Sequence, residues 1–433
     1  MPVNRASGTR DLLPETMIRR LSVIETVRGV FARFGFLPLE TPAIERIETL
    51  MGKYGAEGDQ LIYKILKRGE GGVRGEVDLA LRYDLTVPLA RVVAMNPGLS
   101  MPFKRYQIQP VWRADRPQKG RFREFYQCDV DTVGCEEMWA DAEALAVVDS
   151  ALRALGFAGF TIKLNHRALL RALVEEVGAG DRETGVLVAI DKLDKIGKKG
   201  VTAELERCGL DSAAIERLWS LIDLGGAEGL ELLREQLPAA SQALAQLDEV
   251  LEYTAAMGVP SGTVRFDPTL ARGLSYYTGP VFEVVVEKPA IGSIAGGGRY
   301  DNLIGIFGKK SVPAVGVSLG LERILVVMEE LGMFGELPTA TTQVLVTVFD
   351  DDSRVLALEQ AAALRQAGIN AEVWMKAPGK LGKQFKYANK AGIARVLTCG
   401  PKEREEGQVT LKHMESGEQW TGPLDQAIAR IKG

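Results

Sequence analysis

The sequence predicts an α+β fold: an antiparallel sheet interrupted by a helical insertion and followed by a separate small α/β domain. Three observations predict it. Residues 101–135 alternate apolar and polar side chains on both sides of an arginine-rich turn, as two paired strands do. Residues 167–257 are rich in Leu, Ala and Glu at helical spacing and contain few strand formers. Residues 343–433 alternate strand-like and helix-like segments, which is typical of a compact α/β domain.

The main domain is predicted to occupy residues 1–166 and 258–332, on either side of the insertion at 167–257. Apolar residues at three- and four-residue intervals between positions 15 and 34 predict an amphipathic helix entered through Pro14. The later signals are, in order, strands at 262–266 and 280–287, a glycine-rich turn at 296–298, and a strand and helix at 313–331.

Residues 332–342 have the composition of a linker, after which the last domain begins. Its expected elements are strands at 343–349, 370–375 and 394–399 and helices at 353–367, 380–391 and 423–431.

Length and composition exclude several classes of protein. A chain of 433 residues, 46% of them apolar and 25% charged, is typical of a globular protein with two to four domains. No apolar run approaches the roughly 18 residues that span a membrane. The N-terminal segment lacks the apolar core of a signal peptide, so a cytoplasmic protein is expected.

The few cysteines and histidines restrict the chemistry. Four widely spaced cysteines include no Cys-x-x-Cys pair, which argues against a zinc site or a disulfide framework. The chain has only two histidines, and they are far apart in sequence, which makes a histidine-activated nucleophile improbable. No metal site built from cysteine and histidine is expected. Nucleotidyl transfer fits these limits, because positioning and charge stabilisation can drive it without a protein base. With a net charge of −4, any binding of nucleic acid must use a local basic patch.

The segment at 112–131, WRADRPQKGRFREFYQCDVD, is the strongest functional signal. Its basic residues lie within one turn: Arg113, Arg116, Lys119, Arg121 and Arg123. Guanidinium groups grip phosphate oxygens with two parallel hydrogen bonds, so this turn predicts a polyanion clamp. Asp129 and Asp131 follow directly and can hold a cation or an amine. The segment therefore suggests an enzyme that joins a nucleotide to an amino acid.

Two shorter motifs leave alternatives open. In LRYDLTVPLAR (81–91), Asp84 and Thr86 precede a helix, so they either cap it or bind a ligand ammonium group. In TLARGLSYYTG (269–279), Arg272 is either a solvated charge or an anion ligand, and one of Tyr276 and Tyr277 could bind a polar ligand.

Three other segments also carry a bland and a functional interpretation. GGGRYDNL (296–303) fits no dinucleotide motif and is either a tight turn or a close backbone approach to substrate. In AVGVSLGLERILVVME (314–329) the apolar stripe is expected in the core, whereas Arg323, near the start of the helix, could bind a phosphate or stack on a base. KAPGKLGKQFKYANK (376–390) has five lysines and no acid; Lys383, Lys386 and Lys390 share one helical face, which is either solvated or an RNA contact.

In order along the chain, these segments resemble the motifs of class II aminoacyl-tRNA synthetases, most closely those of the histidyl-tRNA synthetase family. The resemblance covers essentially the whole chain. GTRDLLPE (8–15) is similar to that family's opening signature, FGFLPLETPAIE (34–45) to motif 1, residues 112–131 to motif 2, and GLERI (320–324) to motif 3. ARGLSYYTG and AGGGRYDNL resemble its two histidine-specific segments. RPQKGR, RGLSYY and GGGRYD in this order make the resemblance specific.

The resemblance implies roles for the matching residues. Arg113 and Arg323 would hold the phosphates of ATP, with Arg121 near the nucleotide or the transfer-RNA end. Arg272 would stabilise charge beside the α-phosphate as the carboxylate of histidine attacks. The α-ammonium group or the imidazole of histidine would be bound by Asp84, Thr86, Gln127, Asp131, Tyr276, Tyr277 and Tyr300. Arg116 and Gln118 would contact the acceptor end of the transfer RNA.

The same resemblance implies the rest of the functional assignment. The substrates would be L-histidine, ATP with Mg²⁺, and tRNA(His), and motif 1 around Pro42 would form a homodimer. The main domain would be a class II catalytic domain, the insertion a clamp on the acceptor stem, and residues 343–433 an anticodon-binding domain. Asp84 and Asp131 depart from the glutamate usual in bacterial members, which shortens each reach by about 1.5 Å. The rival assignment is the regulatory paralogue of ATP phosphoribosyltransferase, which lacks the last domain and tends to lose the catalytic arginines.

Overall fold

The computed structural model describes residues 3–271, 276–308, 310–335 and 340–433. The chain divides into two compact units. The first unit combines residues 1–10 with Val23–Met333, and the second combines Asp11–Ser22 with Phe334–Gly433. Among the described residues, no helix is both long enough and apolar enough to cross a membrane.

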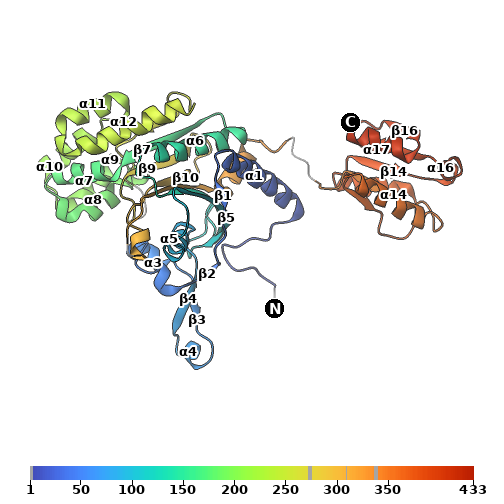
Figure 1. Cartoon of the computed structure of the whole chain (residues 1–433), viewed down its shortest axis with the longest axis horizontal. Helices are drawn as coiled ribbons and strands as arrows, with labels where there is room; N and C mark the ends of the chain where they lie inside the picture. Colours follow the sequence, from blue (N-terminus) through green and yellow to red (C-terminus); the bar gives the residue numbers. More distant parts are fainter. Residues whose placement is uncertain (1–2, 272–275, 309, 336–339) are drawn as a thin grey trace. The chain divides into compact units, whose positions relative to one another are not determined.

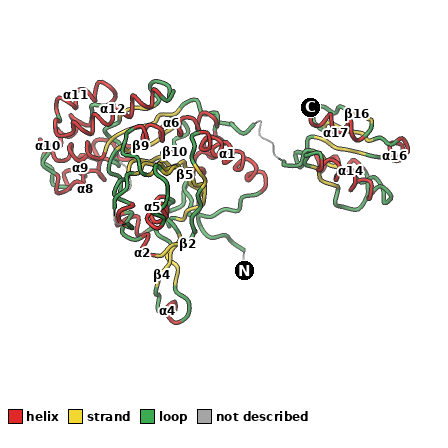
Figure 2. The backbone as a smooth tube through the Cα atoms, in the orientation of Figure 1, coloured by secondary structure: helices red, strands yellow, loops and turns green. Residues whose placement is uncertain are grey.

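An eight-stranded, mostly antiparallel sheet forms the centre of the first unit (Figures 1 and 2). Its strands lie side by side in the order β1 (Leu37–Pro38), β5 (Phe103–Trp112), β6 (Glu124–Val133), β11 (Ala314–Gly320), β10 (Ser293–Arg299), β9 (Pro280–Val286), β7 (Phe160–His166) and β8 (Val264–Phe266). Only the β1–β5 and β7–β8 pairs are parallel among them. The predicted pair of strands around the arginine-rich turn is therefore confirmed as β5 and β6.

The register of β6 brings residues that are far apart in sequence onto one face. Side chains alternate between the two faces of a strand, so Gln127, Asp129 and Asp131 all point to the same side. Strand β11 pairs with β6 and sets Ser318 opposite Asp129 and Gly316 opposite Asp131. This part of the sheet forms the floor of the site described below.

The glycine-rich turn predicted at 296–298 is wrong, because these residues are the middle of strand β10. The glycines are needed for close packing rather than for a bend. A Cβ on Gly297 would lie 2.1 Å from the backbone oxygen of Gly316, and one on Gly298 would lie 2.7 Å from that of Pro280. Neighbouring strands therefore exclude side chains at both positions.

Further helices and a small second sheet accompany the eight-stranded sheet. The helices are α1 (Pro14–Arg33), α2 (Ile47–Leu50), α3 (Gly55–Gln60), α4 (Glu70–Val73), α5 (Thr86–Met95), α6 (Trp139–Ala154) and α13 (Leu321–Glu330). Helix α6 contributes a nearly continuous buried face of Ala, Val and Leu against β6, β10 and β11. The second sheet has the order β2 (Ile44–Arg46), β4 (Val77–Leu81), β3 (Lys64–Leu66), and α4 lies at its far tip (Figure 1).

The segment expected to be helical forms a cluster of helices between β7 and β8. They are α7 (Arg167–Glu176), α8 (Glu183–Ile190), α9 (Leu193–Arg207), α10 (Ser212–Ile222), α11 (Gly226–Gln236) and α12 (Ser241–Ala256). His166 lies at the junction: its Nδ1 accepts a hydrogen bond from the backbone N–H of Ala168 and its Nε2 is 2.9 Å from Gln246 Oε1. This histidine caps α7 and packs against α12, so its role in the structure is positional.

The second unit contains a five-stranded sheet with helices. Its elements are β12 (Val344–Val346), α14 (Arg354–Gln366), β13 (Ala371–Val373), α15 (Leu381–Lys390), β14 (Arg395–Thr398), α16 (Pro401–Glu406), β15 (Val409–His413), β16 (Gln419–Gly422) and α17 (Leu424–Lys432). The predicted strand and helix order is confirmed up to β14 and again at α17. The sequence prediction missed α16 and the antiparallel pair β15–β16, which complete the sheet.

Candidate active site

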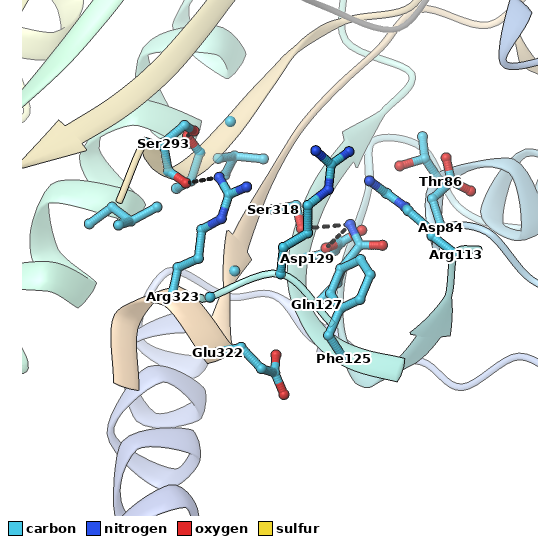
Figure 3. Close-up of a pocket in the computed structure, with 18 of the residues that line it drawn as sticks. Asp84, Thr86, Arg113, Phe125, Gln127, Asp129, Ser293, Ser318, Glu322 and Arg323 are labelled. Carbon is cyan, nitrogen blue, oxygen red and sulfur yellow. Dashed lines mark hydrogen bonds between the residues drawn. The ribbon is translucent and has the colours of Figure 1, made fainter. Parts of the chain in front are cut away.

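A cavity of about 550 Å³ opens above strands β6, β10 and β11 (Figure 3). Most of the residues that line it come from β6, the start of α5, the arginine-rich turn, β10, β11 and the first turn of α13. Eleven of the residues predicted as site residues line it: Asp84, Thr86, Arg113, Gln118, Arg121, Gln127, Asp131, Tyr276, Tyr277, Tyr300 and Arg323. Residues separated by more than two hundred positions therefore meet in one cavity.

Three arginines supply the cationic part of the lining. The Nε of Arg113 donates to the backbone oxygen of Tyr83 at 3.0 Å, and its guanidinium carbon lies 4.2 Å from the centre of the Tyr83 ring. Arg121 is paired with Asp115 at 2.7 Å. Arg323, in the first turn of α13, donates to the backbone oxygen of Ser293 (Figure 3). Because each guanidinium is held by the protein, each is oriented before any phosphate binds.

Residues 8–10 of the N-terminal segment contact the arginine-rich turn. The backbone N–H of Arg123 donates to the backbone oxygen of Gly8 at 2.9 Å. Gly8 has a positive φ of 81°, and a Cβ there would lie 2.7 Å from Arg123 Cγ. Arg10 stacks on Phe122 at 3.5 Å and lies 3.4 Å from Glu322 Oε1. Residues of the opening signature therefore tie the turn to the start of α13.

Gln127, Asp129 and Ser318 form a polar cluster on the floor of the cavity. Gln127 Nε2 donates to Ser318 Oγ at 2.8 Å and lies 3.5 Å from Asp129 Oδ1 (Figure 3). The Oε1 atom of Gln127 is buried and has no hydrogen-bond partner among the described residues. An unmet acceptor in a cavity is suited to bind a ligand N–H group.

Asp131 is buried in the sheet, where it pairs with an arginine. Its carboxylate is 2.8 Å from the guanidinium of Arg105, which is 0% exposed, and it accepts a hydrogen bond from the Tyr300 hydroxyl at 2.5 Å. Gly316 makes room for this arrangement, since a Cβ there would lie 1.9 Å from Asp131 Oδ1. Asp131 thus orients Tyr300 at the floor of the cavity.

Asp84 caps a helix and also lines the cavity, so the capping interpretation is confirmed and the binding of a ligand ammonium group stays a prediction. Its Oδ1 accepts from the backbone N–H of Val87 at 3.1 Å, which caps the start of α5, and from the Tyr54 hydroxyl at 3.0 Å. Its Oδ2 lies 3.4 Å from the Tyr276 hydroxyl. Burial raises the pKa of Asp84, and the hydrogen bond from Val87 opposes that rise.

The sequence predicts that Asp129 can hold a cation or an amine, but the family motifs assign it no role. It lines the cavity between Gln127 and Asp131, and the period-two alternation of β6 was the signal that could have included it. Burial raises the pKa of Asp129 to about 7; Arg105 opposes the rise and the neighbouring Asp131 adds to it. The buried guanidinium of Arg105, which pairs with Asp131, therefore also opposes the rise in the pKa of Asp129.

We expect the Asp129→Asn variant to melt at a higher temperature than the wild-type protein at pH 8. The folded pKa of about 7 lies above the unfolded value of about 4, so the folded state binds this proton more tightly. The contribution of protonated Asp129 to the free energy of unfolding is fully present below about pH 4 and is lost as pH rises through about 7. The advantage of the variant should therefore shrink at pH 5. Thermal unfolding at both pH values tests this, with the exposed Asp78→Asn as control; an equal difference at both pH values would contradict it.

Two further lining residues also lay outside the prediction. Glu322 accepts a hydrogen bond from the backbone N–H of Tyr126 at 2.9 Å, and Lys195 reaches the cavity from the helical insertion. Among the predicted residues, Arg116 is exposed on the turn, and the described lining does not include it. Arg272 lies outside the described residues.

The predicted lysine face is present on α15 in the second unit. Lys383, Lys386 and Lys390 are all exposed. Gln384 fixes the helix, because its Nε2 donates to the backbone oxygen of Val348 at 2.8 Å. The half-exposed Tyr387 packs edge-on against Trp374 with ring centres 5.5 Å apart. Lysines and an accessible aromatic ring therefore occupy one helix.

Comparison with known proteins gives a consistent result. Residues 8–324 match the family model described as histidyl-tRNA synthetase, and residues 343–433 match the model described as anticodon binding domain. A histidine–tRNA ligase from Cytophaga hutchinsonii is 44% identical over 98% of each chain. One from Gloeobacter violaceus is 45% identical over 98% of this chain and 97% of that protein.

Solved structures give the same family. The crystal structure of a histidyl-tRNA synthetase from a Nostoc species has a TM-score of 0.87 and 32% identity, and covers 100% of this chain and 99% of that one. A structure from Bacillus halodurans, described as an ATP phosphoribosyltransferase regulatory subunit/histidyl-tRNA synthetase, has a TM-score of 0.75 and 25% identity. The match covers 89% of this chain and 97% of the Bacillus chain.

A large antiparallel sheet bearing an arginine-lined cavity, joined to an anticodon-binding domain, defines a class II aminoacyl-tRNA synthetase. The enzymes of this class are ATP-dependent ligases. The chain belongs to the histidyl-tRNA synthetase family.

Proposed function

We propose that this chain charges tRNA(His) with L-histidine in two steps at the cavity above β6. In the first step, a carboxylate oxygen of histidine attacks the α-phosphorus of ATP and pyrophosphate leaves. In the second, a ribose hydroxyl of the last nucleotide attacks the histidyl carbonyl and AMP leaves. The observation that carries the proposal is the lining itself, which combines three anchored arginines with buried acids and tyrosines in one cavity.

The arginines are assigned to the nucleotide. Arg113 and Arg323 bind ATP phosphates, and Arg121 lies near the nucleotide or the transfer-RNA end. Arg272 is assigned beside the α-phosphate on the basis of the family motif alone. Fixed guanidinium groups stabilise charge that develops on the phosphoryl centre, and loss of one such donor typically costs on the order of 10²–10³ in rate.

The polar floor is assigned to histidine. Asp84, Thr86 and Gln127 bind the α-ammonium group, with the Tyr276 hydroxyl 3.4 Å from Asp84. Asp131, Tyr277 and Tyr300 surround the imidazole. A pocket that hydrogen-bonds its substrate rejects apolar analogues by roughly 10⁴–10⁵, so no editing domain is required.

We propose that Mg²⁺ enters with ATP as part of the substrate. No group of three His, Cys, Asp or Glu residues that could hold a metal ion occurs among the described residues. The carboxylates of Asp115 and Glu322 already accept hydrogen bonds from the protein. Phosphate oxygens are the usual ligands of Mg²⁺ in such sites.

Histidine-dependent exchange of pyrophosphate into ATP tests the first step. The purified protein should catalyse exchange with histidine and none without it. A protein that binds histidine and shows no exchange would instead support the regulatory paralogue named in the Bacillus structure. Two observations favour the ligase over that paralogue: the anticodon-domain match at 343–433 and the arginines in the cavity.

We propose that the acceptor end of the transfer RNA contacts Arg116 and Gln118 and that the lysine face of α15 contacts the anticodon region. Replacing Lys383, Lys386 and Lys390 with alanine should raise the Michaelis constant for tRNA(His), because each lost phosphate contact weakens RNA binding. Pyrophosphate exchange, which needs no RNA, should stay at the wild-type rate. Steady-state aminoacylation measures the first effect. Replacing Lys402 and Lys432 with alanine is the matched control. An unchanged Michaelis constant in the triple variant would indicate that the lysine face is solvated and does not contact RNA.

The remaining assignments extend from the family motifs. We propose a homodimer formed through the motif 1 segment around Pro42, and a cytoplasmic location where transfer RNA and ATP are both present. The oligomeric state is measured directly by light scattering of the purified protein.

A further inference from the structure

Lys195 reaches the cavity from the helical insertion, whereas the other lining residues belong to the main part of the first unit. It lies in the first turn of α9. The backbone N–H groups of both Lys195 and Ile196 donate to the carbonyl oxygen of Lys192, so this turn is hydrogen-bonded on its own.

A kink separates this turn from the rest of α9. Gly197 has φ 66° and ψ 172°, a backbone conformation that favours glycine. Before the kink, Leu193 and Asp194 line a small cavity of about 20 Å³ together with Lys163 of β7 and Glu283 of β9. The first turn of α9 is therefore seated against the strands of the main sheet, next to the site.

The lysines around the kink differ in their partners. Lys192 pairs with Glu204 at 3.1 Å, and Lys198 pairs with Asp223 at 2.7 Å. Lys198 also lies 4.7 Å from the ring centre of Trp219. Within the described parts of the chain, no ion pair or hydrogen bond is recorded for the Lys195 side chain. Two lysines thus pair within the insertion, and the exposed lysine between them lines the cavity.

A lysine ammonium group at the edge of an arginine-lined cavity is suited to bind phosphate. It is a compact charge on a flexible stem, so it can follow a phosphate group that moves or leaves, whereas the guanidinium groups of Arg113 and Arg121 are held in place by Tyr83 and Asp115. We propose that Lys195 is a substrate-binding residue that the insertion contributes to the active site, where it binds a phosphate group. This inference rests on the proposed function.

Two phosphate sources share this chemistry: the pyrophosphate part of ATP and the terminal phosphodiester of the transfer RNA. The first acts in adenylation and the second in transfer, so separate assays distinguish them. Pyrophosphate exchange at varied ATP concentrations reports the first. Single-turnover transfer of histidine from preformed enzyme-bound adenylate to tRNA(His) reports the second.

The test compares three full-length variants: Lys195→Met, Lys195→Arg and Lys198→Met. We expect Lys195→Met to lose about tenfold or more in one of the two assays, as expected for a charge-assisted contact. Lys195→Arg should recover most of that loss, because it keeps the positive charge. Lys198→Met removes the same charge from the same helix and should match the wild-type protein in both assays. Thermal unfolding checks that all three variants are folded.

The possible outcomes separate this inference from the function on which it rests. A loss confined to exchange assigns the ATP phosphates, and a loss confined to transfer assigns the RNA phosphodiester. Wild-type behaviour of Lys195→Met in both assays would overturn the inference, as would equal losses in Lys195→Met and Lys198→Met or no recovery in Lys195→Arg. Absence of exchange in the wild-type protein would instead overturn the proposed function.

Discussion

Replacing Arg113 with alanine should lower the rate of histidine-dependent pyrophosphate exchange by at least about a hundredfold. This is the usual effect of removing a fixed hydrogen-bond donor that stabilises charge in the transition state. The guanidinium is oriented by the Tyr83 carbonyl at 3.0 Å and by the rings of Tyr83 and Phe125 at 4.2 and 5.2 Å. It is therefore preorganised, and its loss should reduce kcat more than it raises the Michaelis constant for ATP.

Steady-state exchange kinetics on the purified variant measure this effect. Arg113→Lys keeps the charge but not the planar fork, so it should recover only part of the rate. The control is Arg207→Ala, which removes an exposed arginine paired within the insertion. A near-normal exchange rate in Arg113→Ala would show that Arg113 does not contribute to the adenylation step.

Replacing Arg105 with methionine should cause the largest loss of stability. Arg105 is fully buried, pairs with Asp131 at 2.8 Å and donates to Gln107 Oε1 at 3.2 Å. Its charge also opposes the raised pKa values of Asp129 and Asp131. Removing one partner of a buried ion pair typically costs about 3–5 kcal/mol, because the other charge is left unpaired.

Denaturant unfolding at pH 8 measures this loss, and the double variant Arg105→Met with Asp131→Asn supplies the control. Removing both charges should recover much of the stability, although histidine binding should remain weak. If the double variant is as unstable as Arg105→Met, the loss does not come from the Asp131 carboxylate and is caused by packing or by Asp129, the other buried acid near Arg105. A loss that is smaller at pH 5 than at pH 8 would further support the electrostatic explanation, since the acids then take up protons.

Local patterns in the sequence were sufficient to predict the arginine-rich strand pair, the helical insertion and much of the last domain. Alternating residues around the arginine-rich turn predicted β5 and β6, and helical periodicity predicted the insertion, because both signals are contained in short windows. The glycines at 296–298 misled the prediction. Their small size is required by the backbones of Gly316 and Pro280, which lie on other strands. No window around Gly297 contains that information.

The candidate site could be predicted only in part for the same reason. The family motifs brought eleven lining residues into the prediction, yet Arg105, which neutralises Asp131, belongs to no motif and carries no local signal. Lys195 lies among lysines that look alike in the sequence, and only the three-dimensional positions of Glu204 and Asp223 distinguish its neighbours from it. Asp129 was within reach, because it alternates with Gln127 and Asp131 on one strand.

The contact between Arg10 and Glu322 has a consequence for synthesis of the chain on the ribosome. The two residues are 312 positions apart, so Arg10 leaves the ribosome long before its partner exists. At about 5–20 residues per second the interval is roughly 15–60 s. Strand β6 likewise cannot pair with β11, its neighbour in the sheet, until β11 has been synthesised. The cavity, whose lining includes Arg323, is therefore incomplete until about three-quarters of the chain has been translated. The arginine-rich turn is exposed during that interval to the RNA-rich surface of the ribosome.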